Sequence, residues 1–106
     1  MAKDYLGELE ELILNIVGIL GDDAYGYSII TEIKTQLKRD VTLPSAHVTL
    51  YRLEEKGYVK SSVGGATNKR GGRRKRMFKI TASGIAVLKS MKEDRLRLWN
   101  LTPQLR

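Results

Sequence analysis

Apolar residues recur at helical spacing in three stretches of the first half of the chain. The stretches cover residues 6–20, residues 26 or 27 to 37 or 38, and residues 44–56. Apolar positions three and four residues apart share one face of a helix, so each stretch predicts an amphipathic helix. Gly21-Asp22-Asp23 forms a turn after the first, and residues 40–43 predict a short extended link, irregular or a single strand, before the third. The residues of the second helix expected to face inward are Ile29, Ile30, Ile33 and Leu37.

The third predicted helix is the best delimited of the three. Thr42 is a candidate N-cap, Pro44 is tolerated in a first helical turn, and Gly57 can take the left-handed conformation that ends a helix. The apolar stripe consists of Ala46, Leu50 and Leu53. At about 100° per residue, the residues that lie well away from this stripe are Ser45, Val48, Thr49 and Arg52.

This outward face of the third helix is short, polar and nearly free of acid at its N-terminal end. Such a face can enter a DNA major groove, where Arg pairs with guanine and small side chains meet thymine methyl groups. Two helices joined by a short link before a third also follow the order of a helix-turn-helix. The alternative is an ordinary solvated face on a core helix, and from this helix alone that alternative is the stronger.

Two short segments rich in Tyr, Val, Phe and Ile follow the third helix, and these residue types favour strands. Residues 58–63 and 77–80 are predicted to pair as a hairpin. Between them lies GGATNKRGGRRKR, residues 64–76, whose two Gly-Gly pairs mark the hairpin tip. Thr81 is a candidate cap for a last helix over about residues 82–99. The elements together predict a mainly helical α+β fold.

The last predicted helix carries more apolar surface than so small a domain can easily cover. A chain of 106 residues suggests one domain with a modest core, which association with a second copy would stabilise. We therefore expect a homodimer formed through this helix, with a contribution from the first. The candidate dimerisation residues are Ile85, Leu88, Met91, Leu96 and Trp99, with Leu98 adding to the apolar surface.

Charge is distributed unevenly along the chain, whose total net charge is +7. Residues 1–33 contain one basic and seven acidic residues, a net charge of −6, whereas the remainder contains 18 basic and five acidic residues, a net charge of +13. Six of the eight residues from 69 to 76 are basic. A concentrated positive surface attracts polyanions through phosphate contacts and counterion release.

A basic run is usually a solvated face, but this run lies at the tip of a hairpin directly after the candidate DNA-reading helix. A wing on a helix-turn-helix would lie there and would touch phosphates or a minor groove. We therefore favour nucleic-acid contact over mere solvation. The candidate wing residues are Lys69, Arg70, Arg73, Arg74 and Lys75.

Nothing in the sequence supports an enzyme, a metal site or a cofactor site. The chain has no cysteine, which removes disulfides, thiolate zinc sites and thiol nucleophiles and fits a reducing compartment. His47 is the only histidine and has no apparent catalytic or metal-binding partners. No apolar run approaches the roughly 20 residues of a membrane span, and residues 1–12 lack a signal-peptide pattern, so we expect a cytoplasmic protein.

Four segments of the chain resemble PadR-type transcriptional regulators. They are LGELEELIL (6–14), DDAYGYSI (22–29), TLYRLEEKGYV (49–59) and GGRRKRMFKITASG (71–84). They follow the family order and cover most of residues 6–84. The resemblance implies a winged helix-turn-helix over residues 1–81 and a C-terminal dimerisation helix and tail over residues 82–106. It also implies a homodimer that represses transcription from a near-palindromic operator.

Two positions depart from the family pattern. The family often has Tyr where this chain has His47, a position associated with DNA-backbone contact, and often a small residue where this chain has Pro44. The resemblance also allows an aromatic-lined ligand site near the dimer interface, where Trp99 is a candidate to bind a small aromatic inducer. With His47 included, the candidate DNA-contacting residues of the third helix are Ser45, His47, Val48, Thr49 and Arg52.

The leading function is thus a sequence-specific DNA-binding repressor. Its main rival is a nonspecific basic nucleic-acid-binding or architectural protein. Operator competition separates the two, because a repressor should prefer its site by roughly 10³-fold or more over bulk DNA. A third alternative is a protein-interaction module with a solvated basic loop, which would show no DNA binding with a steep salt dependence.

Overall fold

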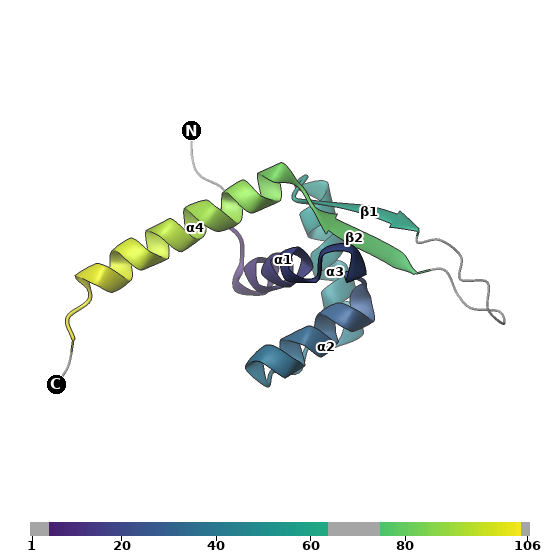
Figure 1. Ribbon diagram of the computed structural model, residues 1–106, viewed down its shortest axis with the longest axis horizontal. Coiled ribbons are helices and arrows are strands. Elements are labelled where there is room, and N and C mark those ends of the chain that lie inside the picture. The colour runs from purple at the N-terminus through teal and green to yellow at the C-terminus, as the bar shows by residue number, and fades with distance from the viewer. Residues whose placement is uncertain (1–4, 64–74, 105–106) are drawn as a thin grey trace.

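The computed structural model describes residues 5–63 and 75–104. Three helices pack together, a two-stranded hairpin extends from them on one side, and a long last helix extends on the other (Figure 1). The elements are α1 (Glu8–Leu20), a short 3-10 turn η1 (Gly21–Asp23), α2 (Gly26–Leu37), α3 (Leu43–Glu55), β1 (Val59–Val63), β2 (Arg76–Ile80) and α4 (Ala82–Leu101). This is the mainly helical α+β winged helix-turn-helix that the sequence predicts.

Helix α1 lies at the centre of the molecule and contacts α2, α3, β2 and α4. Its side chains Ile13, Leu14 and Val17 are completely buried, and Ile16 is nearly so. Removing large aliphatic side chains from water contributes about 1.5–3 kcal/mol each. The core therefore surrounds α1, and the remaining elements are arranged on it.

Helices α2 and α3 cross close together at the start of α2. Gly26 is buried there, and a Cβ atom at this position would lie 2.9 Å from a methyl group of Leu43 and 3.0 Å from the imidazole of His47. Ile29 and Ile33, further along α2, are completely buried in the core. The prediction that Leu37 also faces inward is wrong: its side chain is 54% exposed, because the last turn of α2 extends beyond the core.

The link before α3 contains no strand. Residues 38–42 are irregular, and Lys38 ends α2 in the left-handed conformation with φ of 54°. The predicted caps of α3 are confirmed, since the Thr42 hydroxyl accepts a hydrogen bond from Ser45 N–H at 3.3 Å. Gly57, just after the helix, has φ of 82°, a conformation that favours glycine.

The hairpin is antiparallel, with Val59 opposite Ile80 and Val63 opposite Arg76. A third segment extends the pairing on the other side of β2. Phe78 N–H donates to Ala24 C=O at 2.8 Å, and Tyr25 forms an isolated antiparallel bridge with Met77. The segment between η1 and α2 therefore attaches the hairpin to the helices, a contact that the hydrophobic pattern did not predict.

Helix α4 begins against the hairpin and then leaves the core. The Thr81 hydroxyl caps it by accepting from Gly84 N–H at 3.1 Å, as predicted, and also donates to Gly57 C=O at 2.7 Å. Only Gly84 and Met91 are buried on this helix. Met91 is therefore a core residue of its own chain, and its role in dimerisation stays a prediction. None of the described helices is long and apolar enough to span a membrane.

We predict that Gly84→Ala destabilises the protein by about 1–3 kcal/mol, the usual cost of overpacking. A Cβ atom at Gly84 would collide with the backbone carbonyl of Tyr58, which cannot rotate away. The matched control is Gly18→Ala in α1, where the added methyl group makes an ordinary contact of 3.6 Å with Ile80. That change should stabilise the helix by roughly 0.5–1 kcal/mol. Urea unfolding measures both, and equal effects would contradict the close packing of α4 on the hairpin.

Candidate nucleic-acid interface

The exposed face of α3 carries Ser45, Val48 and Arg52. The prediction that Thr49 shares this face is wrong, because Thr49 is only 5% exposed and its hydroxyl donates to Ser45 C=O at 2.9 Å. The buried arc of α3 includes Thr49 as well as the predicted apolar stripe, since α1 and α2 both pack on the helix. The exposed face of α3 is therefore narrower than the sequence predicted.

Tyr51 belongs to the exposed face of α3, although the sequence analysis did not select it. Its side chain is 48% exposed, comparable to Val48, and it lies three residues further along the helix. Its ring stacks on that of His47, with centroids 6.1 Å apart and an interplanar angle of 27°. The spacing from Val48 was the available signal, because residues three apart are neighbours on a helix surface.

His47 lies at the junction of α2 and α3 rather than on the open face. Its ring packs against Gly26 and is partly covered. Its Nδ1 atom is buried and has no hydrogen-bond partner among the described residues. The structure thus places His47 beside the candidate DNA-contacting residues, in the helix contact that holds them in position.

Two ion pairs attach the ends of α3 to the first turn of α1. Arg39, in the link before α3, makes two hydrogen bonds to the Glu8 carboxylate at 2.7 and 3.0 Å. Lys56, just after α3, contacts Glu10 at 3.0 Å. Each pair ties one end of α3 to α1, so the helix is held in place at both ends.

Both acidic partners titrate below their ordinary range. The hydrogen bond and charge of Arg39 lower the pKa of Glu8. Burial alone raises the pKa of Glu10, but hydrogen bonds from Gly7 N–H and Lys56 and the charge of Lys56 outweigh it, so the net pKa of Glu10 is lowered. The ionised forms of both carboxylates therefore stabilise the fold.

Of the candidate wing residues, only Lys75 falls within the part of the chain that the structure describes. Its ammonium lies 4.1 Å from the centre of the Tyr25 ring, a cation–π contact. Lys69, Arg70, Arg73 and Arg74 lie outside the described residues. The next base, Arg76, begins β2 and donates a hydrogen bond to the Ser61 hydroxyl at 2.9 Å.

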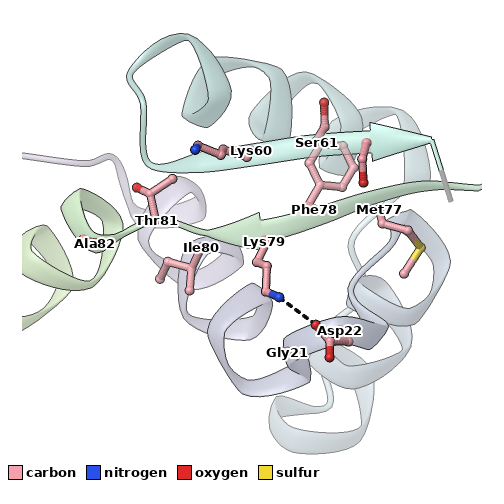
Figure 2. Close-up of a pocket in the computed structure, with 11 residues that line it drawn as sticks. Gly21, Asp22, Lys60, Ser61, Met77, Phe78, Lys79, Ile80, Thr81 and Ala82 are labelled. Carbon is pink, nitrogen blue, oxygen red and sulfur yellow. Dashed lines mark ion pairs between the residues drawn. The ribbon is translucent and has the colours of Figure 1, made fainter.

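A groove lies between η1, the two strands of the hairpin and the start of α4 (Figure 2). Phe78 and Ile80 contribute apolar surface, and Lys79 pairs with Asp22 across it at 2.9 Å. The hydrogen bond from Lys79 lowers the pKa of Asp22, so the groove holds a neutralised pair. No group of three metal-binding side chains occurs among the described residues.

A family model described as the transcriptional regulator PadR-like family matches residues 13–90. The match spans the helix-turn-helix, the hairpin and half of α4. The chain belongs to the PadR-like family.

Solved structures, among them PadR proteins, share this fold. A PadR family transcription regulator from Clostridium difficile is 22% identical, with a TM-score of 0.74 over 90% of this chain and 94% of that one. A protein from Streptococcus mutans is 28% identical, with a TM-score of 0.65 over 89% of this chain and 80% of that one. Bacillus subtilis PadR, solved in complex with operator DNA, is 21% identical, with a TM-score of 0.68 over 97% of this chain and 51% of that one.

No curated protein sequence gives a significant match to this chain. Membership of the PadR-like family nevertheless assigns the broad function: the chain is a DNA-binding transcriptional regulator and not an enzyme. In helix-turn-helix proteins the second helix of the motif enters the DNA major groove, and α3 is the helix in that position in this chain.

The ion pair between Glu10 and Lys56 predicts a specific pH dependence of stability. A carboxylate whose pKa is lowered by folding stabilises the protein above its ordinary pKa of 4.5, and that contribution is lost as pH falls through the lower folded value. We predict that the free energy of unfolding falls less steeply below pH 4.5 in Glu10→Gln than in the unmodified protein. Lys56→Met, which removes the partner, should also flatten the curve. Urea unfolding at several pH values tests this, and parallel curves for all three proteins would contradict it.

Proposed function

We propose that this PadR-family protein is a sequence-specific repressor that binds a near-palindromic operator as a homodimer. The observation that carries the proposal is the exposed face of α3, where Arg52 lies one turn from Val48 and the helix is anchored to α1 at both ends. An Arg among small side chains suits base reading in a major groove. The operator complex of Bacillus subtilis PadR supports the same type of target.

The proposed homodimer is supported by the apolar side chains that α4 leaves uncovered. Leu96, Leu98 and Trp99 are each more than half exposed, and a groove between α1 and α4 is lined by the apolar side chains of Ile19 and Ile85, both also more than half exposed. A second copy placed along α4 would cover this surface. Twofold symmetry would then direct two α3 helices to half-sites about one DNA turn apart, roughly 34 Å.

A nonspecific architectural protein remains the alternative, and selection of bound fragments from random DNA separates the two. A repressor should enrich one near-palindromic sequence and prefer it by roughly 10³-fold or more over bulk DNA. The role of Trp99 as part of a site for a small aromatic inducer stays a prediction. Its 61% exposure leaves the ring accessible in the single chain.

We predict a division of labour between α3 and the basic segment. Arg52→Ala should relax sequence preference at one position in each half-site, at about 1–3 kcal/mol if Arg52 pairs with a base. Arg74→Ala, within the part of the basic segment that the structure does not describe, should weaken all sequences nearly equally. It should also reduce the slope of log affinity against log salt by about one. Fluorescence anisotropy with operator and random duplexes measures both effects, and the reverse pattern would exchange the two roles.

We also predict that Leu96→Asp with Trp99→Ala separates the dimer into folded monomers. Both side chains are exposed in the single chain, so the changes remove apolar contact between copies without opening the core. Leu37→Asp is the matched control, because Leu37 is similarly exposed but lies at the end of α2. Analytical ultracentrifugation reports the mass, and circular dichroism confirms folding. A dimer that survives the double change would place the interface elsewhere.

A further inference from the structure

A chain of hydrogen bonds joins α3 to the hairpin through three polar side chains. The Ser61 hydroxyl of β1 donates to the Glu54 carboxylate of α3 at 2.6 Å. The same hydroxyl accepts from the guanidinium of Arg76, the first residue of β2, at 2.9 Å. We call these three residues the Glu54–Ser61–Arg76 relay.

The strand register explains why these side chains meet. Val63 is opposite Arg76 and Ser61 is opposite Phe78, so Arg76 and Ser61 are diagonal neighbours on one face of the hairpin. A long side chain can bridge that diagonal. The single hydroxyl hydrogen of Ser61 goes to the carboxylate, and its lone pair accepts from the guanidinium. Both bonds involve a charged group, which makes them stronger than bonds between neutral groups.

Lys75, the residue before Arg76, attaches the hairpin to the start of α2. Consecutive residues of a strand point to opposite faces, and Lys75 contacts the Tyr25 ring at the start of α2 while Arg76 is directed toward Ser61. Tyr25 also pairs through its backbone with Met77. The two basic residues at the loop end of β2 are thus attached to the two helices of the helix-turn-helix, Lys75 to the start of α2 and Arg76 to α3 through Ser61.

We propose that Glu54, Ser61 and Arg76 are positioning residues that hold the hairpin at a fixed angle to α3. With that angle fixed, α3 and the hairpin fit the same stretch of operator together, and binding on one element supports binding on the other. This proposal rests on the proposed sequence-specific function. Neither Glu54 nor Ser61 carries a positive charge, so any contribution they make to operator affinity does not come from attraction to phosphate.

A positioning role and simple electrostatics predict opposite changes in operator affinity when Glu54 is replaced. Glu54 is an acid on the helix that faces DNA, so if charge alone mattered, its removal would strengthen binding to every sequence. A positioning role predicts that its removal weakens operator binding. Glu55 provides the comparison, because it is the next residue on α3. Its side chain is exposed and makes no hydrogen bond or ion pair among the described residues.

The first experiment measures affinity of the full-length protein for operator and random DNA across a salt series. Ser61→Ala should lower operator affinity by about threefold to tenfold, as expected for loss of hydrogen bonds to charged groups, and leave random-DNA affinity unchanged. The slope of log affinity against log salt should stay the same, because no basic side chain is removed. Ser61→Thr, which keeps the hydroxyl, and Ser62→Ala, on the opposite face, should both behave like the unmodified protein. An unchanged operator preference in Ser61→Ala would overturn the proposal.

The second experiment compares Glu54→Met with Glu55→Met, which remove the same charge from adjacent positions. Glu55→Met should strengthen binding to both DNAs slightly, whereas Glu54→Met should reduce the ratio of operator to random affinity by a similar threefold to tenfold factor. Urea unfolding of both variants ensures that each is folded under the binding conditions. Equal strengthening by the two changes would show that Glu54 acts through charge alone and would overturn the proposal.

A third measurement needs no DNA and separates failure of this proposal from failure of the proposed function. The chain has no cysteine, so spin labels can be placed on cysteines introduced at Thr35 of α2 and Ser62 of β1, both exposed. The distance distribution between the labels should broaden or shift with Ser61→Ala and stay unchanged with Ser61→Thr. If the unmodified protein shows no preferred DNA sequence, the sequence-specific function fails. An identical label distribution in Ser61→Ala overturns the positioning role in either case.

Discussion

The burial of the apolar face of α1 is the constraint on which the rest of this structure depends. Leu14 and its neighbours on that face are removed from water only because α2, α3, β2 and α4 all pack around one helix. The angle between α3, which is proposed to read DNA, and α4, which is proposed to join two copies, is therefore set by their common contact with α1.

The acidic first turn of α1 is the polar counterpart of this packing. Glu8 pairs with Arg39 before α3, Glu10 with Lys56 after α3, and Glu11 with Arg95 on α4 at 2.6 Å. The three pairs connect α1 to the link before α3, to the residue after α3 and to α4, and so help to orient these elements. Acidic side chains of the first third of the chain thus pair with basic side chains of the remainder.

The sequence predicted what depends on neighbours along the chain and missed what depends on neighbours in space. The helices, the hairpin and the caps at Thr42 and Thr81 follow from periodicity and local hydrogen bonding, and the structure confirms them. Thr49 and Met91 were assigned to outward surfaces because helical phase does not reveal how many elements cover a helix. The relay through Ser61 could not be predicted, because it requires the strand register and the approach of α3 at once.

The outer half of α4 packs on little of the core, so a small rotation of this helix moves its far end by a large distance. Met91 is its last buried residue, and the helix continues to Leu101 for about 15 Å, over which polar contacts such as the Arg95–Glu11 ion pair tie it to the rest of the chain. A rotation of about 10° at Met91 would move the far end by roughly 2–3 Å, a large fraction of the rise between neighbouring DNA base pairs. A dimer joined through this segment would act as a lever, because a slight rotation at Met91 would change the distance between the two α3 helices relative to the pitch of the double helix.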